Sequence, residues 1–540
     1  MTKKILIAVG AVVVLLVVVA IGLALFLDAN QFRPALAAKM TDALGRRVEI
    51  GSLRVSWLAG GVAAEDVVIM DDAKFSKDPF VSAKSVSIGV DLWPLIVSRS
   101  LRVQSFTLDH PRVALIRSNN GVWNFSSLGS GQSSNGSVGA ISVLIQKIKI
   151  AGGQISIRGL DNSRNARSYD DVDVNVSNLS FVSAFPFTVS AKAPAGGSID
   201  VDGEAGPFNL NDVAQTPFHG SVTIKHLDVA QTGFVDASSG IAAVVDFAGT
   251  VASTGTSITT AGKATATNVR LMPGATPSGV PIAVDYESSF NVKNETGVLK
   301  KGDVSIGKAV ARLTGSYRTM GETTSLGMAL RGDKMPVTEL ESALPAIGVT
   351  LPSGAKLTQG TLDFDLAITG PVDRLTIEGP IAMTAAKLTG FDLGEKMGAV
   401  ASLAGVQRVG DTAIDSLKGM LQMTPAGIQI TGFSMVAPSI GTLTGEGTIS
   451  PQGAMNFPML AKLRDGVIAT PISSSAVTKV LSYTQTSGVP FRIQGTTKNP
   501  VFVPDVGRAV QGATDSLKDA AKNPDNLKKA ADAIGGLFRK

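Results

Sequence analysis

The chain has 540 residues, a net charge of +5 and no cysteine; 44% of its residues are hydrophobic and only 17% are charged. The lack of cysteine excludes disulfides, thiol catalysis and thiolate-bound metal. The basic residues are scattered in pairs, without the run that follows a phosphate backbone, so nucleic-acid binding is not expected. Low charge and 58 glycines favour a mainly β protein with many turns.

The first predicted element is a transmembrane anchor from Ile5 to Leu27. This segment carries no charge, and at about 1.5 Å per residue it would span roughly 35 Å. Lys3 and Lys4 precede it, so the positive-inside rule places residues 1–4 in the cytoplasm and the bulk of the chain across the membrane. A cleaved signal peptide is the alternative, although the bulky residues 23–27 lack a small-residue cleavage site.

Residues 28–128 read as one helix followed by short strands. The helix is predicted from Pro34 to Leu44, because Leu36, Met40 and Leu44 repeat every four residues and Gly45 follows. Residues 129–139 are rich in glycine and serine and predict a flexible loop between strands. Further short helices are expected within residues 335–344, 391–403 and 469–482.

The central region, residues 140–384, alternates apolar and polar residues, which predicts strands with one apolar and one polar face. The clearest apolar positions are Val172, Val174, Val176, Ile199, Val201, Leu362, Phe364, Leu366 and Ile368. An apolar sheet face must be covered, and this chain has too few helices to cover so much strand. The remaining solutions are a sandwich, a closed barrel, or a sheet curled so that its apolar face lines a groove.

Residues 385–504 continue the strand pattern, and residues 505–540 form a tail. The tail predicts two amphipathic helices separated at Pro524. Leu537 and Phe538 lie beside Lys528, Lys529, Arg539 and Lys540, so the tail is expected either to cap an open sheet end or to contact a membrane or a partner.

Two sets of segments resemble the AsmA family. The first set runs from Asp28 through Gly45-Arg46-Arg47, Leu53-Arg54-Val55-Ser56-Trp57 and Leu108-Asp109-His110-Pro111 to Gly121-Val122-Trp123-Asn124-Phe125. The second set includes Ala386-Lys387-Leu388-Thr389-Gly390-Phe391, Gly445-Glu446-Gly447 and Gly488-Val489-Pro490-Phe491. The sets occur in the family's order and together cover about half of the chain. Residues 140–380 match it only in style.

The resemblance implies a single-pass protein of the bacterial inner membrane, with a cytoplasmic N-terminus and a periplasmic bulk. It implies a long, curled, antiparallel-rich β-groove of the kind found in bridge-like lipid-transfer proteins. Stacking 25 to 30 strands at about 4.8 Å would give roughly 120 to 140 Å. Members of the family are tied to outer-membrane assembly and to phospholipid movement between the membranes. The family's motifs include no catalytic residue set.

We therefore expect a non-enzymatic protein without cofactor or metal that binds phospholipid acyl chains, with the nine apolar positions of the central region as groove residues. A scaffold that assists outer-membrane protein assembly through contacts with envelope proteins is the alternative, with Leu537 and Phe538 as contact residues. An envelope hydrolase is disfavoured because no nucleophile–base motif is present.

A few polar residues admit a sharper interpretation. His219 and His226 lie seven residues apart, but no further ligands for zinc are evident, so exposed histidines are expected. Asp363 and Asp365 share a strand face and are expected to be solvated charges rather than an acid–base pair. Asp71 and Asp72 read as turn residues. Trp57, Trp93 and Trp123 are expected in the core, with a membrane interface as the alternative.

Overall fold

The computed structural model describes residues 29–56, 61–90, 103–118, 122–128, 145–160, 166–209, 215–232, 235, 239–320, 323–397, 410–463 and 488–505. The predicted anchor Ile5 to Leu27, the loop 129–139, Trp57, Trp93 and the tail with Leu537 and Phe538 lie outside these residues. No helix within the described ranges is long and apolar enough to cross a membrane. The strand pattern of residues 28–504 is therefore the part of the fold prediction that can be compared with the structure.

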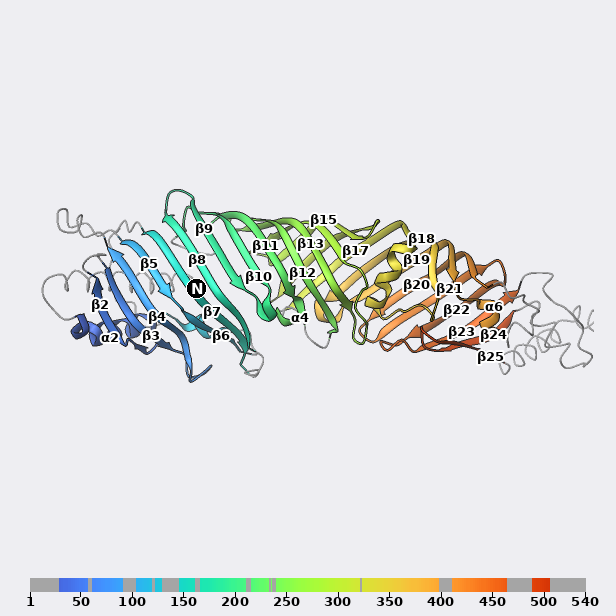
Figure 1. The fold of residues 1–540 in the computed structure, drawn as a ribbon, viewed down its shortest axis with the longest axis horizontal. Helices are drawn as coiled ribbons and strands as arrows, with labels where there is room; N and C mark the ends of the chain where they lie inside the picture. Colours follow the sequence, from blue (N-terminus) through green and yellow to red (C-terminus); the bar gives the residue numbers. More distant parts are fainter. Residues whose placement is uncertain are drawn as a thin grey trace, which may run out of the picture.

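The described residues form 25 strands in one sheet, which makes an elongated molecule with the N-terminal strands at one end and the C-terminal strands at the other (Figure 1). The expectation of a mainly β protein with a large antiparallel-rich sheet and few helices is confirmed. The first third comprises η1 (Ala29–Phe32), α2 (Arg33–Leu44), β1 (Val48–Glu49), β2 (Ser52–Ser56), β3 (Gly61–Met70), β4 (Pro79–Val90), β5 (Val103–Asp109), β6 (Arg112–Arg117), η2 (Asn124–Ser127), β7 (Ile145–Gly159) and β8 (Arg167–Leu179).

The middle third continues as a succession of long strands joined by short connections. It comprises β9 (Phe185–Lys192), η4 (Pro194–Gly196), β10 (Ser198–Ala205), β11 (Phe218–Asp228), α4 (Val229–Thr232), β12 (Ile241–Ser253), β13 (Ser257–Leu271), β14 (Ile282–Asn291), β15 (Thr296–Ile306), β16 (Ala309–Met320), β17 (Thr323–Pro336), α5 (Val337–Leu340) and η7 (Glu341–Ile347).

The last third comprises β18 (Lys356–Pro371), η8 (Val372–Arg374), β19 (Thr376–Thr389), α6 (Leu393–Lys396), β20 (Thr412–Thr424), β21 (Gly427–Ala437), β22 (Gly441–Ile449), β23 (Met455–Leu463), β24 (Val489–Gly495) and β25 (Pro500–Pro504). Strand β19 runs through residues 384 and 385, where the sequence suggested a regional boundary, so the sheet is continuous there. The helix expected within 391–403 is the single turn α6, and its continuation beyond residue 397 is not described.

From β7 to β25 each strand pairs with the next one in antiparallel fashion. Two positions near the N-terminal end hold two short strands each: β1 and β2 both pair with β3, and β5 and β6 both pair in parallel with β7. At about 4.8 Å per strand the stack is therefore roughly 105 Å long along its path. This is shorter than the sequence-based expectation, because four of the strands share two positions.

Recurrent β-bulges bend the long strands, and an aspartate on the neighbouring strand satisfies several of the bulge amides. Gly152, His226 and Lys334 all have positive φ, and their backbone N–H groups donate to Asp173, Asp246 and Asp363 over 2.9, 2.6 and 2.8 Å, respectively. An extra residue in one strand increases the local twist and bends the sheet. The repeated bulges thus account for the curl, and Asp363 is one of the groups that hold them in place.

Buried apolar residues form three clusters, one toward each end of the sheet and a small one in β16 and β17. The N-terminal cluster forms where Leu36, Met40 and Leu44 of α2 pack on β1 to β5, as the four-residue repeat predicted, and α2 ends at Gly45 with φ 67°. The C-terminal cluster extends from Met272 to Phe491 and is the largest, and a small third cluster surrounds Ala309, Ala311 and Met335. The described parts of β8 to β15 contribute no cluster of their own.

Candidate functional site

The candidate site is the inner face of the curled sheet, which the strand register defines residue by residue. Partners in the register share a face, so the pairings can be followed from strand to strand. One row crosses twenty positions and contains no charged residue: Val62, Ile88, Phe106, Ile148, Val176, Phe187, Gly203, Gly220, Val251, Thr260, Ser288, Leu299, Gly315, Met328, Ile368, Ile377, Met423, Ile428, Ile449 and Met455.

Two further rows run beside the first one and are also uncharged. One row comprises Leu53, Ala64, Val86, Leu108, Ile150, Val174, Val189, Val201, Val222, Gly249, Gly262, Tyr286 and Gly302. The other row comprises Ala191, Ile199, Ile224, Phe247, Ala264, Val284, Val304, Ala311, Gly332, Phe364, Ile381 and Gly419.

The structure brings the nine apolar positions singled out in the sequence to this one face. Six of them lie in the three rows, and Val172, Leu362 and Leu366 lie on the same face by the two-residue period of their strands. Val172 and Leu366 are buried, at 8% and 9% exposure, and the other seven are half-buried. The positions alternate with outward residues such as Asp200 and Asp202, which are exposed.

Glycines and aromatic rings shape the inner face in its middle section, which comprises β8 to β15 and the adjoining strand β16. Gly203, Gly220, Gly249, Gly262, Gly302 and Gly315 occupy row positions there, so the wall carries no side chain at these points. The Phe247 ring covers Gly249 and Gly262, and a Cβ on either glycine would meet that ring within 2.7 Å. Phe247 and Tyr286 lie 5.9 Å apart, and Phe290 stacks on Tyr317 at 6.0 Å. The inner face of the middle section is consequently lined partly by aromatic rings and partly by bare backbone.

A few hydroxyl groups are the polar exceptions in these rows; they lie in β13 and β14, and the Tyr317 hydroxyl joins them from β16, one strand beyond β15. Ser288 is 6% exposed, and its hydroxyl lies 3.0 Å from that of Tyr317, so this buried pair satisfies itself. Thr260 is the register partner of Ser288, and Tyr286 lies two residues before it. The hydroxyls add hydrogen-bonding capacity to an otherwise hydrocarbon wall without adding charge.

The outer face carries the charges that the inner face lacks. Lys301 lies 3.1 Å from Asp285 and 3.7 Å from Asp303, and the hydrogen bond to Asp285 raises the pKa of the Lys301 ammonium. Arg331 and Asp365 form an exposed ion pair at 3.0 Å. The expectation that Asp363 and Asp365 are strand-face charges rather than an acid–base pair agrees with these partners, because Asp363 accepts from a bulge amide and Asp365 pairs with an arginine.

The curled sheet closes on itself in its C-terminal part. Successive connections alternate between two rims, and the β13–β14 connection (272–281) belongs to the rim opposite the β18–β19, β20–β21 and β22–β23 connections. A Cβ on Gly274 would lie only 3.1 Å from the Pro451 carbonyl, so the rims touch. A cavity of about 70 Å³ at this contact is lined by Met272, Val372 and Pro425, among others. In Figure 1 the yellow strands β18 and β19 cross the green strands of the middle section, as a coiled sheet requires.

Residues 341–355, here called the strap, lie between the two rims. At one end, the Gly279 N–H donates to the Ser342 carbonyl at 2.8 Å. At the other end, Thr350 and Thr497 share a hydroxyl hydrogen bond at 2.9 Å, and the Ser353 N–H donates to the Lys498 carbonyl at 3.1 Å. Between these contacts, three apolar residues of the strap pack against the C-terminal cluster: Ile347, Val349 and Leu351. The strap therefore packs on apolar residues of the inner face in the C-terminal part of the sheet.

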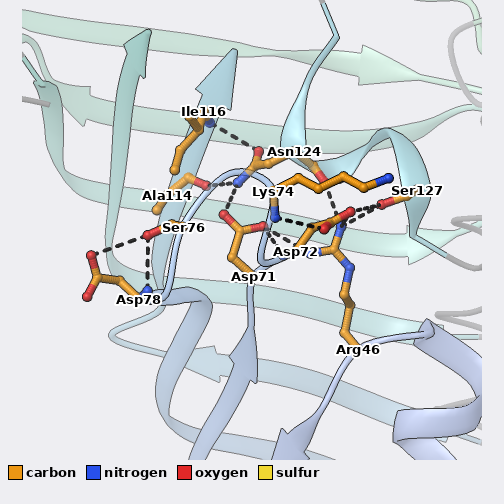
Figure 2. Close-up of polar contacts among 10 residues, drawn as sticks. All are labelled: Arg46, Asp71, Asp72, Lys74, Ser76, Asp78, Ala114, Ile116, Asn124 and Ser127. Carbon is orange, nitrogen blue, oxygen red and sulfur yellow. Dashed lines mark hydrogen bonds and ion pairs between the residues drawn. The ribbon is translucent and has the colours of Figure 1, made fainter. Parts of the chain in front are cut away.

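A buried polar cluster ties the N-terminal end together (Figure 2). The Arg46 guanidinium, from the link between α2 and β1, donates to the Asp71 carboxylate at 3.0 Å and to the Asn124 carbonyl at 2.8 Å. The Asn124 amide donates in turn to Asp71 and to the Ala114 carbonyl, and its side-chain oxygen accepts from the Ile116 N–H. Asp71 has a fully buried side chain, and Arg46 is 6% exposed. The cluster joins α2, the β3–β4 connection and η2, so its role is structural.

The histidines show no sign of a metal centre. His219 and His226 are exposed and lie 3.7 and 3.9 Å from Glu204 and Asp246, respectively. Across the residues that the structure describes, no group of three potential metal ligands gathers. Trp123, the one tryptophan described, is half-buried, stacks on Phe125 at 5.7 Å and receives the Arg117 guanidinium over its ring at 5.4 Å. Its contacts are therefore with neighbouring side chains of the N-terminal region.

The fold and the inner face define a class of protein: a single long sheet that curls around an uncharged, incompletely covered interior. The family model of the AsmA family matches residues 1–268, which run from the N-terminus into β13. This match supports the assignment of the chain to the AsmA family. The match includes part of the central region, where the sequence resembled the family only in style, whereas the resemblance in residues 385–504 stays a prediction. No curated protein and no solved structure matches the chain.

Proposed function

We propose that this protein binds phospholipid acyl chains along the inner face and thereby supports phospholipid transport between membranes and outer-membrane biogenesis. In this proposal residues 5–27 anchor the chain in the bacterial inner membrane, and the sheet lies in the periplasm. The observation that carries the proposal is the continuous uncharged inner face, whose middle section is only half-buried within the described residues. Half-exposed apolar rows are unfavourable in water, and each methylene that a lipid buries there contributes about 0.8 kcal/mol.

The geometry also supports head groups staying outside the groove. The inner rows offer only hydroxyls to a charged group, so a phosphate or ammonium placed there would lose its hydration without an ionic partner. Acyl chains satisfy the wall, and the open mouth of the middle section leaves the head group in water. No covalent chemistry or cofactor enters this mechanism. Sliding along the rows needs no charged group to be dehydrated, which suits movement over many strands.

The proposal is tested by photocrosslinking on the full chain in its own membranes. A benzophenone amino acid replaces Val201, which faces inward, or Asp202, which faces outward on the same strand. We expect phospholipid adducts, identified by mass spectrometry, at position 201 and not at position 202. A pair of charge insertions provides a second test. Val174→Asp should reduce the adduct at position 201 at least threefold, while Asn175→Asp, one residue away on the outer face, should leave it unchanged.

Equal labelling of both faces, or no lipid adduct at position 201, would contradict the proposal. Adducts with envelope proteins in place of lipid would instead favour the scaffold alternative, in which the protein assists outer-membrane assembly through protein contacts. The neighbouring-residue design separates these outcomes from lipid that merely surrounds the anchor, because such lipid is the same for positions 201 and 202.

A further inference from the structure

The strap occupies the place on the inner face that a lipid occupies in the proposed function. The uncharged row of the middle section continues in the C-terminal section as Met423, Ile428 and Ile449, and all three belong to the C-terminal cluster. Ile347, Val349 and Leu351 pack against that cluster from the strap. Two parts of one continuous surface are thus covered differently, the C-terminal part by the chain's own side chains and the part in β8 to β15 by no buried cluster among its described residues.

Hydroxyl and backbone groups make the contacts of the strap with the two rims, and the Glu341 carboxylate at its start accepts from the Leu357 N–H of β18 at 2.8 Å. The Thr350–Thr497 hydroxyl pair and the Ser353–Lys498 backbone bond hold it to the β24–β25 turn, and Ser342 holds it to Gly279 on the other rim. Hydrogen bonds of this kind exchange readily with water, because their net contribution to stability is small. The apolar contacts are likewise exchangeable, since an acyl chain presents the same chemistry to the cluster as Ile347, Val349 and Leu351 do.

The strap also has backbone positions suited to turning. Gly348 ends η7 with φ 75°, and Gly354 has φ 82° with no atom within 4 Å of the place of a Cβ. Both conformations are natural for glycine and strained for other residues. Because the two glycines flank Val349 to Ser353, the segment that carries the Thr350 and Ser353 contacts lies between two permissive joints.

We propose that the strap is a gate on the lipid path. In the closed state, Ile347, Val349 and Leu351 of the strap stay packed against the C-terminal cluster as they are here, and lipid is confined to the middle section. In the open state the Thr350 and Ser353 contacts with the β24–β25 turn are released, and acyl chains replace Ile347, Val349 and Leu351 on the C-terminal cluster. This inference rests on the proposed function, because a gate needs a cargo.

A disulfide lock tests the gate directly, because the chain has no cysteine of its own. The T350C/T497C variant replaces two hydroxyls that lie 2.9 Å apart, a spacing compatible with a disulfide. The matched control is T319C/T324C, which replaces two threonines 3.3 Å apart on the adjacent strands β16 and β17 and cannot restrain the strap. The full chain is reconstituted in vesicles of phosphatidylethanolamine and phosphatidylglycerol, and transfer of a fluorescent phosphatidylethanolamine to acceptor vesicles is followed before and after reduction.

We expect oxidised T350C/T497C to transfer lipid at least fivefold more slowly than the same protein after reduction, with no such difference for the control. The position-201 lipid adduct should persist in the locked protein, because the middle section stays open. T350V/T497V, which removes the hydroxyl bond but keeps the side-chain size, should transfer about twofold faster than the unmodified chain.

Each of the following results would overturn the gate. Equal transfer by the oxidised and reduced lock would show that lipid does not pass under the strap. Loss of the position-201 adduct in the locked protein would show that the strap supports the whole groove. If the disulfide did not form, an unchanged rate for T350V/T497V would be decisive against the gate. Adducts at position 201 without transfer by the unmodified chain would leave acyl binding standing and remove both transport and the gate. Absence of the adducts would remove the proposed function itself.

Discussion

The middle and C-terminal sections of the sheet have the same local construction and differ in what covers them. Both consist of long antiparallel strands whose inward residues are apolar and whose register is continuous from one section to the other. In β8 to β15 the described inner rows are mostly half-buried, whereas in β19 to β24 they form a cluster that includes Met459, Ala461 and Phe491 at 2% exposure or less. The strands of the two sections are alike, so the difference in burial of the inner face comes from the segments that pack on it.

This difference assigns separate tasks to the two sections. A filled section gains stability from side-chain packing, since close-packed interiors lose energy whenever volume is removed. An open section gives up that stability and keeps room for a ligand. The contact between the rims lies where the two sections meet, and the strap is bound to the same rim connection through Gly279 and Ser342. Substitutions of matched chemistry in the two sections test this difference.

The largest expected effect is a truncation in the filled section. Phe491→Ala should reduce the free energy of opening of β23 and β24 by about 3–5 kcal/mol, because Phe491 is 1% exposed and stacks on Phe502 at 6.3 Å. Val222→Ala, at a half-buried row position of the middle section, should cost less than about 1 kcal/mol in lipid-free protein. Hydrogen exchange of the full chain, resolved by peptide, measures both. Similar costs at the two positions would show that the middle section is packed as well.

The second prediction concerns the N-terminal end, which is closed by charge as well as by apolar packing. Arg46→Met should destabilise the contact between α2 and the β3–β4 connection by about 3–5 kcal/mol, because it leaves the buried Asp71 carboxylate without its cation. The neighbouring substitution Arg47→Met is the control. Arg47 is 76% exposed and pairs with Glu49 at the surface, so its loss should cost less than about 1 kcal/mol. Urea denaturation, monitored by hydrogen exchange at the α2 amides, distinguishes the two variants.

The sequence predicted which strand residues share an apolar face, but not which distant segments pack on that face. A two-residue period is local, so Val174, Val201 and Phe364 could be placed on apolar faces, and the four-residue repeat located α2 and its three buried residues. The closure of the sheet depends on contacts between residues far apart, such as Thr350 with Thr497, and no local pattern encodes these. Of the strap, only residues 341–344 fell within a predicted element, the short helix expected within residues 335–344.

The Arg46 cluster shows the same limit for polar residues. In the sequence, Gly45 marked the end of a helix, Asp71 and Asp72 were expected in a turn, and Trp123 was expected in the core. Their meeting in one buried network depends on the packing of α2 against the β3–β4 connection and η2, which bridges separations of up to 81 residues. The sequence offered only an indirect signal. Arg46 and the two aspartates Asp71 and Asp72 each lie beside an apolar strand, and a charge that is buried there needs a partner of opposite sign.

The smallest predicted effect separates two carboxylates that the sequence treated alike. Asp363→Ala removes the acceptor of the Lys334 amide at a bulge and should cost about 1 kcal/mol, because the bulge amide is left without its protein partner. Asp365→Ala breaks only an exposed ion pair with Arg331, whose side chain is 70% exposed, and should cost less than about 0.5 kcal/mol. Exchange rates of the β17 and β18 amides report both. A larger effect at Asp365 than at Asp363 would mean that charge, rather than the bulge, maintains the curl of this hairpin. Asp173 and Asp246, which accept from bulge amides in the same way as Asp363, would then lose their assigned role in bending the middle section.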